Sequence, residues 1–266
     1  MLIAQITDTH VKPEGELACQ RVDSAAYLAR AVDHILHLET PPDIVLATGD
    51  LVDAGSAEEY VRLRRLLAPL PMPVYLIPGN HDDREALRRE WSHERYMPRD
   101  GFIQYVVDAG PLRLVALDTL LPGSSGGLVD AERIAWLDAR LGEAPSKPTM
   151  IFMHHPPFKT GIPYMDSIGL AGADDLAHVV RRHPQVERVV CGHLHRTIHS
   201  RWAGTVATTA PSTAHQIFFD VREDATLAWA LEPPGYALHL WRQDVGLVSH
   251  VVTIGEFSTY SLGLRA

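Results

Sequence analysis

Five short clusters of histidine, aspartate and asparagine are the part of this sequence that could do chemistry. The clusters read Asp8-Thr9-His10, Gly49-Asp50, Gly79-Asn80-His81-Asp82, His154-His155 and Gly192-His193-Leu194-His195. They offer imidazole nitrogens, carboxylate oxygens and one amide oxygen, but no thiolate. Such a mixture of nitrogen and oxygen donors suits divalent ions such as manganese, iron, cobalt and zinc. The sequence therefore predicts a metal site built from segments that lie far apart in the chain.

Each cluster follows a segment that has the pattern of a buried strand. These expected strands cover residues 2–7, 43–48, 73–77, 149–153 and 186–191. Apolar spacing predicts helices over 23–38, 60–67, 82–91, 131–141 and 174–183, and a hairpin from strands over 103–107 and 113–117. In α/β proteins, ligands gather beyond the carboxyl ends of the strands. We therefore expect five strands to bring the five clusters to one rim.

The pattern of expected elements changes after His195, from alternating strands and helices to strands alone. Five more strand-like runs follow, over 197–202, 205–209, 216–221, 236–241 and 248–254, with no convincing helix between them. We therefore expect an α/β core over residues 1–196 and a β-rich extension over residues 197–266 that closes one side of the core.

Composition limits the classes of partner. The chain has 266 residues, enough for one large or two small domains, and its formal net charge is −9. This negative charge argues against a nucleic-acid polymer or an anionic membrane as partner. The N-terminal apolar run is too short for a signal peptide, and no apolar run approaches the length of a membrane helix. We therefore expect a cytoplasmic protein without a membrane partner.

Taken in order, the clusters resemble the motifs of the calcineurin-like metallophosphoesterases. The matching motifs are D-x-H at residues 8–10, G-D-x-x-D at 49–53, G-N-H-D at 79–82, H-H-P-P at 154–157 and G-H-x-H at 192–195. The stretches YLIPGNHDD and IFMHHPP are similar to the bacterial branch of glycerophosphodiesterases and cyclic-nucleotide phosphodiesterases. The resemblance implies a four-layer α/β/β/α sandwich, completed by the β-rich extension, with a dinuclear metal site at its rim.

The family pattern implies seven ligands around two divalent ions. One ion would be held by Asp8, His10, Asp50 and His195, and the other by Asp50, Asn80, His154 and His193. Asp50 would bridge the two, which has a physical reason: cations about 3.5–4 Å apart repel each other unless anions lie between them. The ions would be iron, manganese, zinc or cobalt, and the sequence leaves their identity open.

Residues beside the ligands have expected roles of their own. The resemblance gives His81 a catalytic role, in which it either stabilises charge on the substrate or donates a proton to the leaving group. The alternative is that His81 only supports a ligand through a hydrogen bond. Asn80, His81 and His215 would contact the substrate, although His215 is equally plausible as a surface histidine. Asp53 and Asp82 either orient ligand histidines or cap helices.

The remaining histidines are expected to take no part in the chemistry. His155 is expected to be structural, because the family ligand is the first histidine of H-H-P-P. His239 and His34 are among those that lie in no motif.

The expected reaction is hydrolysis of a small phosphodiester by a metal-bound hydroxide. Glycerophosphodiesters are favoured, and 3′,5′-cyclic nucleotides are the alternative. An adenine would need aromatic contacts, for which Phe158, Tyr164, Phe218 and Phe219 are candidates, although all four could equally be core residues. Dimers or larger homo-oligomers are implied by the resemblance, and the block 227–241 is a candidate interface.

Two further classes compete with the diesterase. Phosphoprotein phosphatases of the same superfamily carry an arginine where this chain has Ala54, which disfavours a phosphomonoester substrate. A non-catalytic scaffold that has lost its metals is disfavoured because all seven ligand positions are kept.

Overall fold

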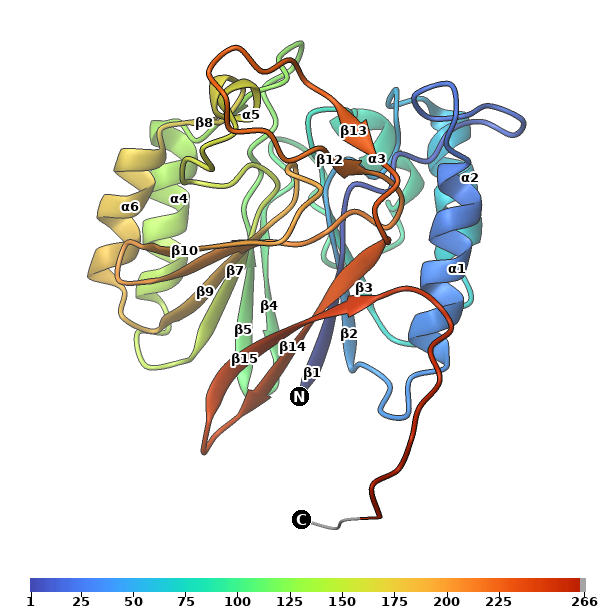
Figure 1. Cartoon of the computed structure of the whole chain (residues 1–266). Helices are drawn as coiled ribbons and strands as arrows, with labels where there is room; N and C mark the ends of the chain where they lie inside the picture. The colour runs from blue at the N-terminus through green and yellow to red at the C-terminus, as the bar shows by residue number, and fades with distance from the viewer. Residues whose placement is uncertain (264–266) are drawn as a thin grey trace.

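Two β-sheets face each other between two layers of helices (Figure 1), in a computed structural model that describes residues 1–263. The first sheet has the strand order β15-β14-β1-β2-β3, and the second has the order β10-β11-β9-β7-β5-β4. Helices α1 and α2 cover the first sheet, and helices α4 and α6 cover the second. The expected α/β class and its four-layer arrangement are confirmed.

Strands β1, β2 and β3 of the first sheet are parallel to one another. Its strands are β1 (Leu2–Ile6), β2 (Ile44–Thr48), β3 (Val74–Ile77), β14 (Gly235–Arg242) and β15 (Gly246–Thr253), and its helices are α1 (Ser24–Leu36), α2 (Ala57–Leu67) and α3 (Arg84–Glu90). Strand β14 pairs antiparallel with β1, so the C-terminal hairpin lies beside the first strand of the chain. Local capping starts the helices: the Asp23 side chain accepts from the Ala26 amide, and Ser56 and Glu59 form a capping box.

The second sheet receives strands from both halves of the chain. Its strands are β4 (Tyr105–Ala109), β5 (Leu112–Ala116), β7 (Thr149–Phe152), β9 (Val186–Cys191), β10 (Ile198–Trp202) and β11 (Thr205–Thr209), and its helices are α4 (Ala131–Gly142) and α6 (Ala173–Arg182). Short elements lie above the sheets: β6 (Gly127–Leu128) with β8 (Leu170–Ala171), β12 (Gln216–Ile217) with β13 (Trp229–Ala230), and α5 (Pro163–Ser167).

A continuous apolar core joins the two sheets. It includes Ile3 and Leu46 of the first sheet and Leu114 and Phe152 of the second, all fully buried. Each such side chain stabilises the fold by about 1.5–3 kcal/mol relative to an exposed one. A second cluster fills the space between the second sheet and helices α4 and α6. The two cores fix how the strand ends of one sheet lie relative to those of the other.

Three local expectations are wrong. The expected strand over 103–107 is found at 105–109, because the amide of Ile103 donates to the carboxylate of Asp118 instead of joining the ladder. The expected strand over 216–221 ends at Ile217. Helix α3 begins at Arg84 with Asp83 as its cap, so Asp82 is not the capping residue.

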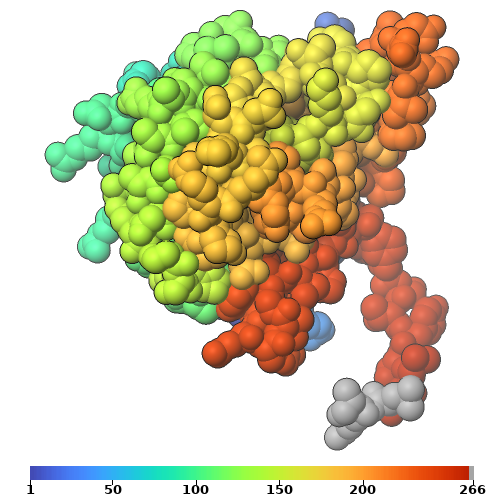
Figure 2. Space-filling view, turned by 90° about the vertical axis from the view of Figure 1, so that its left-hand side faces the viewer, coloured from blue at the N-terminus to red at the C-terminus, as the bar shows by residue number. Residues whose placement is uncertain are grey.

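Residues 255–263, which follow β15, leave the body of the molecule. Figures 1 and 2 both show this C-terminal stretch running away from the sandwich. Phe257, Tyr260 and Leu262 in it are exposed. Within residues 1–263, none of the helices has the length and apolar character needed to cross a membrane.

Candidate metal centre

The loops after β1, β2 and β9 bring the first expected ligand set together. One donor atom each from Asp8, His10, Asp50 and His195 lies within 4.8 Å of the others, and all four residues are buried. Nε2 of His195 lies 3.3 Å from Oδ1 of Asp8 and 3.2 Å from Nε2 of His10. Two carboxylates and two imidazoles thus converge on one small volume, as a cation requires.

The second expected set shares Asp50 with the first. Nε2 of His154 lies 3.3 Å from Oδ2 of Asp50 and 3.3 Å from Oδ1 of Asn80. The rings of His154 and His193 are 5.2 Å apart, and one nitrogen of each lies within 4.8 Å of the other. All seven residues expected from the sequence therefore lie at one rim.

Each of the four histidines uses one ring nitrogen in a bond away from the centre. Nδ1 of His154 donates to the Thr48 carbonyl at 2.8 Å, and Nδ1 of His195 donates to the His215 carbonyl at 2.9 Å. Nδ1 of His10 lies 3.2 Å from the Asp53 carboxylate, whereas His193 uses Nε2, 3.2 Å from the Ile168 carbonyl. The other nitrogen of each ring remains for a metal ion, which is the arrangement expected of ligand histidines. The donor set fits divalent ions.

Two of the four histidines are neutral, as this geometry requires. Burial, followed by the repulsion of neighbouring histidines, lowers the pKa of His193 and of His195 to about 3, so both rings are neutral with a free lone pair. Burial opposes protonation of His154, but the charge of Asp50 and its hydrogen bond raise the pKa of His154 to about 9. A cation bound there would displace the proton of His154.

Five of the expected ligands have a left-handed backbone, although none of them is glycine. These are Asp8 (φ 51°), His10 (42°), Asp50 (47°), His193 (69°) and His195 (48°). A side chain in this region costs free energy of order 1 kcal/mol, and such strain clusters at functional sites. The sharp turns at the strand ends direct alternate side chains into the centre.

Three glycines of the motifs leave room for the ligands. A Cβ at Gly49 would lie 2.5 Å from Nδ1 of His154, and one at Gly192 would lie 2.9 Å from the Asp8 carboxylate. A Cβ at Gly79 would lie 2.8 Å from Cε1 of His154 and closer still to the Asp50 carboxylate. The motif glycines are therefore required by close packing of the expected ligands.

We expect Gly79→Ala to weaken Mn²⁺ binding by about 10-fold or more, since an added methyl must push Asp50 or His154 out of place at a cost of about 1–3 kcal/mol. Calorimetric titration of the metal-free protein measures this. Gly142→Ala is the matched control, because a Cβ at this helical glycine meets no atom within 4 Å. Equal affinities in the two variants would contradict the packing argument.

Asp53 and Asp82 have different roles. Asp53 accepts from His10 and also from Nζ of Lys12 at 2.8 Å, so its carboxylate orients an expected ligand. Asp82 neither orients a histidine nor caps a helix. Its carboxylate accepts from the amides of Leu51 and Gly79 and from the Tyr60 hydroxyl, and so it ties together the loops that carry Asp50 and Asn80.

His81 lies at the edge of the centre and is open to solvent. Its side chain is 40% exposed, and its ring is 4.7 Å from the ring of His10. Nδ1 of His81 donates to the Asp53 carbonyl at 2.8 Å, which leaves Nε2 free. An open nitrogen beside the ligands is what a substrate-contacting residue needs.

The other two histidines near the centre are buried. His215 is only 5% exposed, so the alternative of a surface histidine is wrong. Its ring lies 4.7 Å from that of His195 and its Nε2 faces Sγ of Cys19 at 3.8 Å. His155 uses Nδ1 on the Thr119 hydroxyl and Nε2 on the Ser125 carbonyl, which agrees with a structural role.

Several residues that shape the centre were not found by sequence reasoning. Lys12, Cys19 and Tyr60 contact Asp53, His215 and Asp82. Lys12 alone carried a signal, because it is two positions after His10 and an extended chain directs alternate residues to the same side. Cys19 and Tyr60 come close only through tertiary packing.

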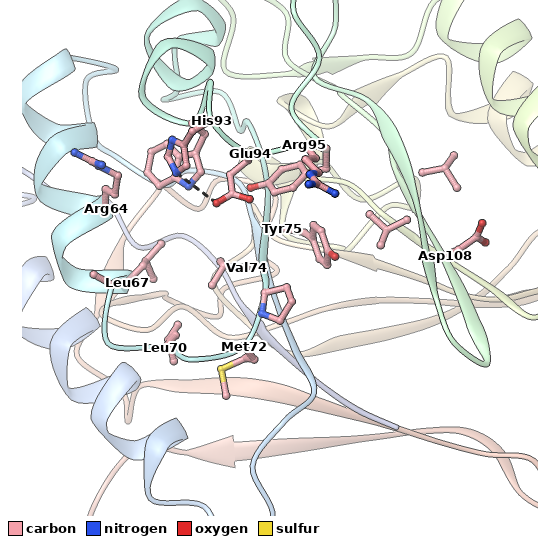
Figure 3. A pocket seen from close by; sticks show the side chains of 16 residues that line it. Arg64, Leu67, Leu70, Met72, Val74, Tyr75, His93, Glu94, Arg95 and Asp108 are labelled. Atoms are coloured by element: carbon pink, nitrogen blue, oxygen red, sulfur yellow. Dashed lines mark ion pairs between the residues drawn. The ribbon is translucent and has the colours of Figure 1, made fainter.

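A separate pocket lies between the outer strands β3 and β4 (Figure 3). Its volume is about 860 Å³, and Val74, Tyr75, His93 and Glu94 are among its lining residues. None of the expected site residues lines it, so it is distinct from the metal centre.

The sandwich and its rim of histidine and carboxylate donors define a metal-dependent phosphoesterase. The family model described as calcineurin-like phosphoesterase matches residues 1–197. The chain belongs to this family, as the motifs predicted. The family and the donor clusters together support binding of divalent metal ions.

Relatives with known names agree with the class. A probable glycerophosphodiester phosphodiesterase of Arcobacter nitrofigilis is 38% identical over 97% of this chain and 94% of its own length. A 3′,5′-cyclic adenosine monophosphate phosphodiesterase of Pseudomonas aeruginosa is 30% identical over 81% of this chain and 77% of its own length. The expected class, a metal-dependent phosphodiesterase, is confirmed. A dimetal phosphatase from Danio rerio shares the fold, with a TM-score of 0.66 and 17% identity over 96% of this chain and 99% of that one.

Proposed function

We propose that this centre binds two divalent ions and hydrolyses small phosphodiesters, with glycerophosphodiesters preferred over 3′,5′-cyclic nucleotides. The observation that carries the proposal is the position of Asp50 between the two donor sets. Its Oδ2 lies 3.8 Å from Nε2 of His10 on one side and 3.3 Å from Nε2 of His154 on the other. A single carboxylate in this position can serve two ions at once.

The proposed first ion would be held by Asp8, His10, Asp50 and His195, and the second by Asp50, Asn80, His154 and His193. Iron, manganese, zinc and cobalt all suit these donors. When bound, such ions lower the pKa of water and offset the negative charge of a phosphate.

His81 is the proposed catalytic residue. Because Nδ1 already donates to the Asp53 carbonyl, Nε2 can act as a donor only when the ring carries both protons. The protonated ring can then bind a phosphate oxygen or give its proton to the leaving alkoxide. Asn80 and His215 are proposed as further substrate contacts.

We favour glycerophosphodiesters as the substrate class because the A. nitrofigilis relative is named a probable glycerophosphodiester phosphodiesterase and matches nearly the whole chain. Cyclic nucleotides are the second candidate, which the P. aeruginosa relative supports. Exposed aromatic side chains that could meet an adenine are Tyr164, Phe218 and Phe219. Ala54, in place of the phosphatase arginine, continues to disfavour phosphomonoesters.

We also propose a homo-oligomer, a dimer or larger. The exposed apolar residues Phe218, Leu227 and Leu231 support it, because apolar side chains gathered on one segment favour protein contacts. The division into a core over 1–196 and an extension over 197–266 is kept as a proposal, supported by the end of the family match at residue 197. The cytoplasmic location and the lack of nucleic-acid and membrane partners stay predictions.

The proposal is tested with chelator-treated protein before and after addition of Mn²⁺. We expect chelation to abolish hydrolysis and Mn²⁺ to restore it. We further expect kcat/KM for bis-p-nitrophenyl phosphate to exceed that for p-nitrophenyl phosphate by about 10-fold or more, or about 1.4 kcal/mol. Glycerophosphoethanolamine and cyclic AMP are then compared under the same conditions. A monoester preference, or activity that survives chelation, would refute the proposal.

A further inference from the structure

A chain of buried hydrogen bonds connects the two sheets beneath the metal centre. Its middle is Gln5 of β1, which is 1% exposed. Nε2 of Gln5 donates to Oγ1 of Thr48 and to the carbonyl of Cys191, both at 2.9 Å. Thr48 ends β2 in the first sheet and Cys191 ends β9 in the second. One amide group therefore joins the ends of two strands that belong to different sheets.

Both strand ends lead directly into expected ligands. Thr48 is two positions before Asp50, and Cys191 is two positions before His193. The carbonyl of Thr48 also accepts the hydrogen bond from His154 that fixes this ring. The relative positions of three ligands of the proposed second ion thus depend on the two strand ends that Gln5 joins.

His239 of β14 fixes the orientation of the Gln5 amide. His239 is 0% exposed, and its Nε2 lies 3.0 Å from Oε1 of Gln5. An amide oxygen can only accept, so Nε2 of His239 must carry the hydrogen. Nδ1 of His239 therefore accepts from the hydroxyl of Ser249 at 2.7 Å, and this hydroxyl accepts in turn from Arg188 at 2.8 Å.

Each group in this chain donates a hydrogen bond to the next, from Arg188 through Ser249 and His239 to Gln5. Every polar side-chain atom of Gln5 and His239 has a partner. If the amide of Gln5 turned over, its NH₂ group would face the N–H of His239 and its oxygen would face the Cys191 carbonyl. Burial, together with the charge of Arg188, lowers the pKa of His239 to about 3, so the ring stays neutral and the pattern is stable over ordinary pH. A fully satisfied buried network has a single well-defined geometry.

The fold does not need Gln5 to satisfy the Cys191 carbonyl. That oxygen already accepts from the Ala210 amide at 3.1 Å. The added bond from Gln5 therefore sets a distance between two strand ends, and it does not rescue an otherwise unpaired group.

We propose that Gln5 and His239 are positioning residues of the metal centre: they hold the ends of β2 and β9 at the separation that lets Asp50 and His193 bind the same ion. The inference rests on the proposed two-ion centre. His239 acts through Gln5, and neither residue contacts the substrate or an ion.

The test compares Gln5→Leu and His239→Leu with Gln185→Leu. Gln185 is a matched control, because it is a buried amide that donates to the Leu141 carbonyl far from the ligand loops. We expect Gln5→Leu to weaken Mn²⁺ binding to the metal-free protein by about 10–100-fold, as the loss of supporting contacts does at other metal sites. His239→Leu should weaken binding less, because Gln5 remains. Gln185→Leu should lower the melting temperature but leave Mn²⁺ affinity unchanged.

Two outcomes would overturn the inference. The first is wild-type Mn²⁺ affinity in Gln5→Leu, or in His239→Leu if Gln5→Leu does not fold. The second is a hydrogen on Nδ1 of His239 in nitrogen NMR of the metal-free wild-type protein. The inference requires this hydrogen on Nε2. Neither readout uses a substrate, so a protein that binds Mn²⁺ as expected but hydrolyses no diester would refute only the proposed reaction. A wild-type protein that does not bind Mn²⁺ would refute both.

Discussion

Asp50→Asn is expected to lower diesterase turnover by about 10³-fold or more, equivalent to about 4 kcal/mol. The substitution keeps the shape of the side chain but removes the negative charge between the two donor sets. Two proposed cations would then repel each other without the shared carboxylate. Metal analysis of the purified variant should find fewer than two ions per chain, and bis-p-nitrophenyl phosphate reports the loss of turnover.

The control for Asp50→Asn must separate a lost ligand from a lost charge. Asp33→Asn on α1 removes one carboxylate whose side chain is 74% exposed, outside the centre, and should leave both turnover and metal content unchanged. Because Asp50 also pairs with His154, the melting temperature of Asp50→Asn is measured alongside. Wild-type turnover with two bound ions would show that Asp50 does not bridge.

His81→Ala is expected to lower kcat by about 10²–10³-fold while both ions remain bound. The ring makes one hydrogen bond, to the Asp53 carbonyl, and its side chain is 40% exposed, so its removal should leave the ligand loops in place. Steady-state kinetics and metal analysis measure the two quantities separately. His93→Ala is the matched control, since His93 is an exposed histidine in the separate pocket.

The leaving group distinguishes the two roles of His81. If His81 donates a proton, His81→Ala should harm a diester with an alkoxide leaving group more than one with p-nitrophenolate, which leaves without protonation. If the residue stabilises charge on phosphorus, both substrates should lose similar factors. Loss of the metal ions from His81→Ala would instead assign the residue to support of the ligands.

Local sequence signals were sufficient for most of the architecture. The strands that precede the proposed ligands and helices α1, α2 and α4 lie within a few residues of their expected ranges, because apolar periodicity and capping residues act over short distances. The predictions from local sequence were wrong where a residue makes a tertiary contact in place of the expected local one. Ile103 looked like a strand residue but gives its amide to Asp118, and Asp82 looked like a cap but joins two loops.

For the site as well, some features could be predicted from local sequence and others depended on tertiary contacts. The sequence by itself determined the donor types, their order and their places at strand ends, because these depend on residue identity and local hydrophobic pattern. Only the tertiary structure decided which nitrogen of each histidine faces the centre, that His215 is buried, and that His239 meets Gln5. Gln5 and His239 are 234 positions apart and meet because their strands, β1 and β14, pair in the first sheet. Local periodicity carries no information about such a distant partner.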